Sequence, residues 1–569
     1  MGKKSRLKRE RRESQTDTPV RGSAQARPQR QDLKFQAQID GLRGYLTRFA
    51  AVDVLVSLGV SELWRPNRSS QVKHTFATLI AMSTPPAAFS AGAAIDTYED
   101  FAGFLDGLGR LLPRFPLLED FVPEADWGEV RVAGAKDFEP IFYGGSVERI
   151  PDFIEAFRLL EGDEAKALAD INLAVALQAH IIRSVEAGVV GSDQRVRAGH
   201  IEVPSADFWQ ACRAALQTAW AAVKPLAQPT SESLTVELGA LRRPDSSAHF
   251  GDSILTGTAL PVMFASVAGT VVPLSPRSAT AVVVDLWDKR SAARAPEALK
   301  LVGRRLGGFL AKRFRQHDVV PGPARVMARS HRFDYDVAAV VRSGARICII
   351  LVLNPDQVQQ LAQIEKRLQR VVDESDRWGL ALEDTRQIAE FRNSAGAFAR
   401  ANDVQIIAVL ARVTTQPTVL GLPETKARVM GLPDFVSLFD ALEKGEELER
   451  FWAYLDDLGP RVGGFAGLID HFASFRDTHA VLIDGAISPD YISLDPHWNS
   501  NWRFEQLRAF WADAPDRFPD DQATWVIERK NDGLARLTAK GPLTLVWSGK
   551  AGACTVQALM EIDTVANTL

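Results

Sequence analysis

Seven consecutive apolar residues, Ile347 to Leu353, restrict the fold of this chain more than any other segment. A strand that is apolar at every position must be covered on both faces, as in the centre of a sheet with helices on either side. The preceding run, Phe333–Val341, begins with the carboxylates Asp334 and Asp336 and then becomes apolar, and a turn at Ser343-Gly344 joins the two runs. The sequence therefore predicts two adjacent strands of an α/β domain.

Further elements are expected around these two strands. An amphipathic helix over about 296–315 precedes them, and two helices follow the apolar run. The first of these two lines one face with apolar residues at helical spacing, namely Val358, Leu361, Ile364, Leu368 and Val371. A strand over Val404–Leu410 comes next, and Pro433-Asp434 starts a helix that continues through Leu442. Residues 296–445 thus predict helix, strand, strand, helix, helix, strand and helix.

This order resembles the PD-(D/E)XK nuclease superfamily, whose fold is called restriction-endonuclease-like. The resemblance implies an acidic residue on an early helix, an aspartate at the start of one strand, and Glu-x-Lys on the next. In such a site, carboxylates hold a divalent metal that activates water, and the lysine stabilises the charge that develops during phosphodiester hydrolysis. Asp336, or alternatively Asp334, matches the strand-start aspartate.

The remaining positions depart from the nuclease pattern. Residues 349–354 contain no Glu-x-Lys in either frame, and the helix segment Leu306-Gly307-Gly308 carries no carboxylate. One carboxylate does not supply the oxygen ligands that Mg²⁺ requires. The resemblance therefore implies a degenerate domain with a vestigial acidic position and neither metal nor cofactor. Mg²⁺ enters only if the site has been rearranged.

Two groups of cations are candidate nucleic-acid contacts. One is the helix over 296–315, and the other is the basic cluster near the N-terminus. Each has a plainer interpretation, as a solvated helix face and as a solubilising tail. Because the net charge is -4, contact with DNA or RNA must come from a local patch. The residues are Arg304, Arg305, Lys312, Arg313 and Arg315 in the helix, and Lys3, Lys4 and Arg6 in the tail.

At 569 residues the chain is too long for one core, so we expect a mixed α/β multidomain protein. The expected divisions are a disordered basic tail (1–32), a mainly helical domain (33–230), a β-rich segment (231–295), the nuclease-like α/β domain (296–450) and a Trp-rich α+β C-terminal domain (451–569). In the helical domain, helices are expected within 33–49, 100–112, 150–160, 164–187 and 206–224. Strands are expected at Leu234–Leu238, Ile254–Thr258, Val262–Val267, Thr270–Pro273 and Ala279–Trp287, and near 479–484 and 523–528.

The C-terminal part also collects residues that bind metals or transfer protons: Asp470, His471, His479, Asp484, Asp495 and His497. None of the histidines shows the spacing of a zinc helix, so scattered core and surface residues are the expected outcome. Residues 253–276 carry no charge over about the length of a membrane span. Pro261 and Pro273 interrupt that stretch, which favours buried strands and no membrane.

Three functions remain open on this basis. The first is a non-catalytic nucleic-acid- or protein-binding scaffold on a degenerate nuclease-like domain, in bacterial genome maintenance or phage defence. The second is a metal-dependent nuclease with a rearranged active site. The third is a protein-interaction module formed by the helical half and the Trp-rich tail. Three widely spaced cysteines and a charged start predict a cytoplasmic protein.

Overall fold

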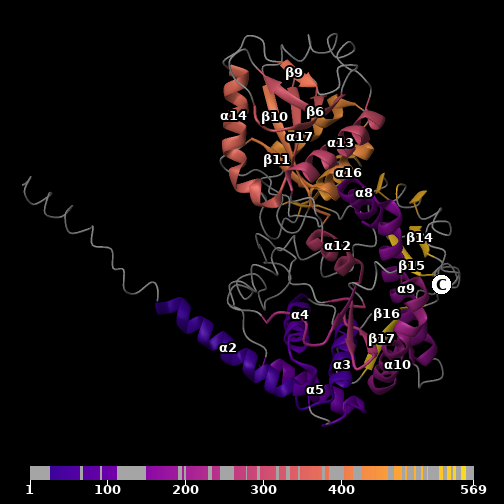
Figure 1. Ribbon diagram of the computed structural model, residues 1–569. Coiled ribbons are helices and arrows are strands. Elements are labelled where there is room, and N and C mark those ends of the chain that lie inside the picture. Colours follow the sequence, from indigo (N-terminus) through magenta and orange to yellow (C-terminus); the bar gives the residue numbers. More distant parts are fainter. Residues whose placement is uncertain are drawn as a thin grey trace, which may run out of the picture.

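The computed structural model describes residues 26–558 with gaps, and its architecture is a mostly helical mixed α/β fold (Figure 1). The gaps are 65–67, 90–91, 112–148, 190–194, 198–199, 228–233, 244–261, 277–278, 291–294, 315–318, 328–332, 344–345, 374–378, 383–402, 414–425, 443, 459–466, 477–480, 484–491, 495–501, 504–505, 507–508, 511–524, 530–534, 540–542 and 546–552.

Helices form the first part of the chain. They are α2 (Ala26–Leu46), α3 (Ala51–Trp64), α4 (Arg68–Met82), α5 (Tyr98–Leu111), α8 (Ile150–Glu161), α9 (Glu164–Val189) and α10 (Ser205–Val223). In α2, Phe35, Ile39, Leu42 and Leu46 are buried at three- and four-residue steps, which is the pattern that predicted a helix here. Helix α2 begins at Ala26, which is ahead of the boundary at residue 32 expected for the basic tail.

A small sheet and one helix occupy the expected β-rich segment. Strands β3 (Thr235–Glu237), β4 (Phe264–Val267) and β5 (Thr270–Pro273) lie in that order. The last two form a hairpin whose turn residues, Ala268 and Gly269, both have positive φ. The strand expected over 254–258 lies outside the described residues.

The strand expected at Ala279–Trp287 was wrong, because this segment is helix α12 (Ala279–Arg290). Its run of three valines, 282–284, favours a strand locally, and tertiary burial overrides that preference. All three valines are buried against the helical core. The Trp287 indole N–H donates to Asp170 on α9 at 2.9 Å, which fixes the helix against its neighbour.

A six-stranded sheet follows helix α13 (Pro296–Arg313). In chain order its strands are β6 (Val319–Met327), β7 (Val337–Ser343), β8 (Arg346–Leu353), β9 (Gly379–Leu382), β10 (Asp403–Leu410) and β11 (Arg428–Gly431). In space they run β11-β10-β8-β7-β6-β9. Strands β8, β10 and β11 are parallel, and the pairs β8-β7, β7-β6 and β6-β9 are antiparallel. The expected adjacency of the two runs 333–341 and 347–353 is thus present as β7 and β8.

Three of these strands, β6, β9 and β11, were not anticipated. Strand β6 contains Pro321-Gly322-Pro323, a combination that argues against a strand when read locally. The β6–β7 register shifts between Pro321 and Ala324, so a bulge accommodates the two prolines. Strand β9 lies between α14 and β10. A second helix was expected somewhere in this stretch, of which residues 374–378 and 383–402 lie outside the described residues.

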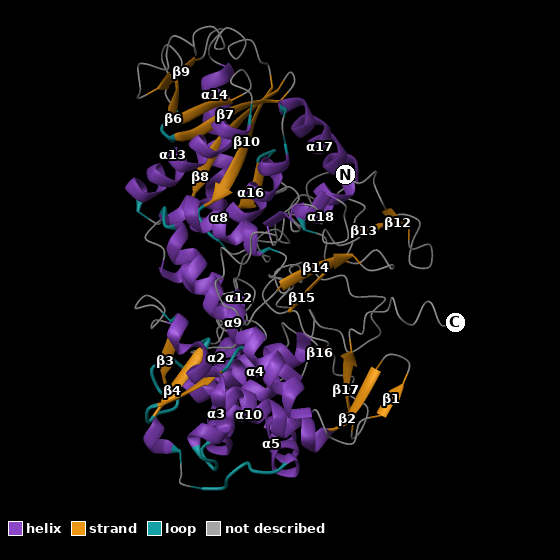
Figure 2. Cartoon of the chain, turned by 90° about the vertical axis from the view of Figure 1, so that its right-hand side faces the viewer, coloured by secondary structure: helices purple, strands orange, loops and turns teal. Residues whose placement is uncertain are grey.

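Helices cover both faces of this sheet, as the apolar run of β8 required (Figure 2). On one face, Ala339, Cys348 and Ile350 belong to a core that also includes α13, α16 (Leu432–Ala441) and α17 (Gly445–Leu458). That core continues without interruption into the helices of the first part of the chain. On the other face, Val340 and Ile349 pack with α14 (Leu361–Asp373), which follows the short helix η6 (Pro355–Gln360).

The C-terminal elements return to earlier parts of the chain. Helix α18 (Leu468–Arg476) packs on α16 and α17. Two antiparallel pairs follow, β12 (Val481–Ile483) with β13 (Ile492–Leu494) and β14 (Trp525–Arg529) with β15 (Ala535–Ala539). Strand β17 (Ala553–Ala558) pairs with β16 (Leu543–Leu545) and with β2 (His200–Pro204), which also pairs with β1 (Arg195–Arg197). The expected boundary between residues 450 and 451 falls inside α17. No helix within the described ranges is long and apolar enough to cross a membrane.

Candidate functional site

Asp336 lies at the end of the sheet where strands β8 and β10 finish. It directly precedes β7, whose first residue, Val337, pairs with Ala324 of β6 and with Leu351 of β8. The carboxyl ends of parallel strands are where α/β proteins most often bind ligands. The position of this carboxylate therefore suits a functional site. The side chains around Asp336 determine whether that site could hold a metal ion.

Two cations flank the Asp336 carboxylate. Arg325 on β6 donates from Nε to Oδ1 at 3.3 Å, and Lys300 on α13 places Nζ 3.9 Å from Oδ2. The Lys300 ammonium also lies 3.3 Å from Oε1 of Glu297. The side chains of Asp336, Lys300 and Arg325 are 26%, 32% and 38% exposed. We call Glu297, Lys300, Asp336 and Arg325 the sheet-end charge group. Asp334 is exposed and does not belong to it.

Strand β8 contributes no carboxylate beside Asp336. The register of β7 on β8 brings Leu351 to Val337, so the last residues of β8, Val352 and Leu353, lie alongside Asp336. Leu351 and Leu353 are both buried. Among the residues that the structure describes, no group of three or more His, Cys, Asp or Glu side chains could hold a metal ion.

These neighbours do not fit the divalent metal of a PD-(D/E)XK site. A divalent ion needs several oxygen ligands, and the two cations beside Asp336 would repel it. The same cations satisfy the carboxylate without a metal. The arrangement therefore provides an ion-paired surface group at the sheet end, and no step of metal-assisted hydrolysis follows from it.

The cations of α13 do not form one continuous binding face. Arg305 donates from Nη1 to the carbonyl oxygens of Leu159 and Leu160, at 3.2 and 2.7 Å, and so satisfies the last turn of α8. Arg313 is ion-paired with Asp440 at 2.5 Å. Arg304 and Lys312 are exposed. Arg315, Lys3, Lys4 and Arg6 lie outside the described residues.

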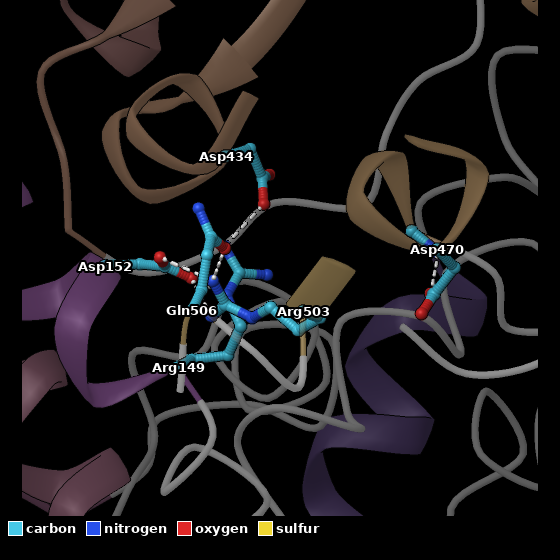
Figure 3. Close-up of polar contacts among 7 residues, drawn as sticks. Arg149, Asp152, Asp434, Asp470, Arg503 and Gln506 are labelled. Carbon is cyan, nitrogen blue, oxygen red and sulfur yellow. Dashed lines mark hydrogen bonds and ion pairs between the residues drawn. The ribbon is translucent and has the colours of Figure 1, made fainter. Parts of the chain in front are cut away.

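A second group of charged side chains, whose contacts are drawn in Figure 3, is almost wholly buried. Arg149, the residue before α8, donates from Nε to Asp152 at 2.6 Å and from Nη2 to Asp434 at 2.8 Å. Arg503 donates to both oxygens of Asp152, at 3.2 and 2.6 Å. All four residues are at most 7% exposed. We call Arg149, Asp152, Asp434 and Arg503 the buried charge quartet.

The local sequence explains how two carboxylates can be buried here in their charged form. Asp152 and Asp434 both lie in the first turn of a helix, α8 and α16, where free N–H groups and the helix dipole favour negative charge. The two helices pack against each other, so their N-terminal turns meet. Two guanidinium groups then balance two carboxylates, which is the condition for keeping charges in a dry interior.

The quartet shifts the pKa values of its members in different directions. Burial alone would lower the pKa of Arg149, and the carboxylates of Asp152 and Asp434 instead raise it above its ordinary value. Burial would raise the pKa of Asp152, but Arg503 and Arg149 hold it below its usual range. For Asp434, burial prevails over the single partner Arg149, and the pKa is raised. Asp152 is thus the firmly ionised member, and Asp434 is the member closest to protonation.

The sequence contained a signal for this quartet that was missed. Residues 150–160 and 432–442 both read apolar-Pro-Asp-Phe, with a second Phe four residues later and a Leu at the end. Each Pro occupies the start of its helix and places the Asp in the first turn. The matching segments predict two similar helix starts, but nothing local shows that they meet or that Arg503 joins them.

The His and Asp residues of the C-terminal part do not form a site within the described ranges. His471 is fully buried on α18. Asp470 accepts the Gly467 N–H at 2.6 Å and so caps that helix. His479, Asp484, Asp495 and His497 lie outside the described residues. Comparison of the chain with protein-family models, with curated proteins and with solved structures found no match.

Proposed function

We propose that this protein is a non-catalytic nucleic-acid-binding scaffold, in which residues 296–445 keep the plan of a PD-(D/E)XK nuclease without its metal site. The observation that carries the proposal is the pairing of Asp336 with Lys300 and Arg325 beside an apolar strand end. A nuclease needs further carboxylates where this chain has cations and leucines. The adjacency of β7 and β8, on which the resemblance depends, supports the same proposal.

Binding is the remaining activity that such a sheet supports. The chain carries a net charge of -4, so attraction to a polyanion must come from local cations. Exposed cations do occur on the helices that cover the sheet, including Arg304 and Lys312 on α13. Contacts of this kind position a protein on phosphates and carry no sequence information of their own.

The test combines a cleavage assay with a binding assay on the full chain. We expect plasmid DNA and a structured RNA to remain intact with Mg²⁺ or Mn²⁺, while a labelled DNA duplex binds at low salt and dissociates as salt rises. Cleavage that Asp336→Ala abolishes would overturn the non-catalytic part of the proposal. Absence of binding at low salt would overturn the nucleic-acid part.

A further inference from the structure

Helix α14 has two chemically different faces. Leu361, Ile364, Leu368 and Val371 are buried against the sheet. The opposite face carries Lys366, Arg367 and Arg370, all exposed, at the spacing that places residues on one side of a helix. Figure 1 shows α14 on the outer side of the sheet, with no described element covering it.

The acidic residues near these cations are occupied elsewhere. Both carboxylate oxygens of Glu365 accept the backbone N–H of Lys426, each at 3.1 Å. Asp373 accepts from the amide of Gln369 at 2.6 Å. Within the described part of the chain, Lys366, Arg367 and Arg370 have neither an ion pair nor a side-chain hydrogen bond. The contact with Glu365 also brings Lys426, which is exposed, next to the helix.

We propose that Lys366, Arg367, Arg370 and Lys426, the α14 cation stripe, bind the phosphate backbone of duplex DNA. This inference rests on the proposed function and names the surface that performs it. Residues 366 to 370 extend about 6 Å along the helix axis. Phosphates succeed one another along a DNA strand at a rise of roughly 3.4 Å, so the stripe can meet consecutive phosphates.

Two other partners fit this face less well. A helix that binds a membrane surface inserts its apolar face into the lipid, and the apolar face of α14 is already buried in the protein. The core of a protein interface concentrates aromatic residues, methionine and arginine, and it is depleted in lysine and in charged residues as a group. The exposed positions of α14 are charged or are glutamines such as Gln363 and Gln369. The stripe therefore matches a polyanion with a regular charge spacing.

Salt dependence of DNA binding measures the contribution of the stripe directly. The probe is a labelled DNA duplex, titrated with the full-length protein over a range of salt concentrations. For the triple variant Lys366→Gln, Arg367→Gln and Arg370→Gln, the slope of log Kobs against log salt should become shallower by about 2.7, because each lost phosphate contact removes about 0.9. The affinity of the wild type should then fall about 40-fold more than that of the variant between 50 and 200 mM salt.

A matched triple variant controls for net charge. Lys34→Gln, Lys224→Gln and Lys444→Gln remove the same number of exposed cations from other elements. This control should keep the wild-type slope. An equal loss in both triple variants would assign the effect to overall charge and overturn the inference.

The remaining outcomes separate the two proposals. A wild type that binds DNA, with an unchanged slope in the α14 variant, would overturn only the inference about the stripe. A wild type that does not bind DNA at low salt would overturn the nucleic-acid proposal and the stripe with it. Binding to anionic vesicles or to polyglutamate, at salt concentrations where DNA does not bind, would assign the stripe to another anion and overturn the inference.

Discussion

The guanidinium group of Arg503 donates one hydrogen bond to each carboxylate oxygen of Asp152, although the two residues are 351 positions apart in the sequence. The pair is buried on both sides, with side-chain exposures of 2% and 5%. Through Asp152 and Arg149 the same network reaches Asp434 on α16. The network therefore joins three segments that are far apart in the chain: the start of α8, the start of α16 and the segment that carries Arg503. It lies next to the sheet that carries the candidate site.

Removing Arg503 should destabilise the protein strongly. In Arg503→Met, Asp152 and Asp434 would share one guanidinium in a dry interior, and an uncompensated buried charge costs roughly 3–5 kcal/mol. Urea unfolding measures the change in free energy. Arg158→Met is the control, because its pair with Glu155 is about one-third exposed and such pairs contribute about 1 kcal/mol or less.

A double substitution tests whether the cost arises from unpaired charge. Asp152→Leu combined with Arg503→Met leaves Arg149 and Asp434 as a balanced pair. The double variant should therefore be more stable than the sum of the two single losses predicts. Strictly additive losses would show that the two side chains contribute independently, which contradicts the network.

The two carboxylates of the quartet should respond to pH in opposite directions. The pKa of Asp434 is raised from 3.8 by burial, so the folded state binds this proton more tightly than the unfolded state. The stabilisation that Asp434 contributes is therefore fully present at pH values below its pKa in the unfolded state, and it is lost as the pH rises through its pKa in the folded state. The pKa of Asp152 is lowered from 3.8, chiefly because Arg503 and Arg149 outweigh burial. The stabilisation that Asp152 contributes is fully present at pH values above its pKa in the unfolded state, and it is lost as the pH falls through its pKa in the folded state.

Unfolding free energies measured from about pH 3 to about pH 7 separate these contributions. The stability of the wild type relative to Asp434→Asn should decrease as pH rises from 3.8. Relative to Asp152→Asn, it should decrease as pH falls below 3.8. The same sign of pH dependence in both comparisons would contradict the assigned shifts.

Divalent metal should not stabilise this protein through Asp336. An ion bound only by the folded state raises the melting temperature with its concentration. Because Lys300 and Arg325 already occupy the carboxylate, we expect Mg²⁺ to change the melting temperature of the wild type and of Asp336→Ala by the same amount. A Mg²⁺-dependent increase that is present in the wild type and absent in Asp336→Ala would restore the nuclease interpretation.

Local sequence patterns predicted a helix or strand correctly where the spacing of buried apolar residues determines the conformation of the segment. The spacing of Leu361, Ile364, Leu368 and Val371 predicted α14, and the apolar run of β8 predicted a strand covered on both faces. The same reasoning failed for α12, where three valines favoured a strand and burial among helices decided otherwise. It also failed for β6, where the bulge that accommodates Pro321 and Pro323 is a property of strand pairing.

The candidate sites depended still more on long-range contacts. Asp336 was identified from its place before an apolar strand, but its partners Lys300 and Arg325 come from two other elements. Arg305 was a candidate phosphate contact, and the structure shows it satisfying carbonyls of α8. The sequence pattern gives the type of a side chain and its position on a helix or strand. Tertiary packing determines which other residue it pairs with.

Two neighbouring glycines on α13 should respond oppositely to alanine. A Cβ on Gly307 would lie 2.7 Å from the carbonyl oxygen of Ala338 and 3.2 Å from the backbone nitrogen of Gly322, and backbone atoms cannot move aside cheaply. A Cβ on Gly308 would meet nothing within 4 Å. Gly307→Ala should therefore destabilise the protein by about 1–3 kcal/mol through overpacking. Gly308→Ala should stabilise it by about 0.5–1 kcal/mol through helix propensity.

The glycine pair also tests the position of the sheet-end charge group. Lys300 reaches Asp336 because α13 lies close to β6 and β7, and Gly307 permits that approach. Displacing the helix in Gly307→Ala should therefore weaken the Lys300–Asp336 pair, so that Asp336→Ala costs less in this background than in the wild type. In the Gly308→Ala background the cost should be unchanged, because the helix does not move. Urea unfolding of the wild type, the three single variants and the two double variants measures these costs. An equal cost of Asp336→Ala in the Gly307→Ala and Gly308→Ala backgrounds would show that the approach of α13 does not set this contact.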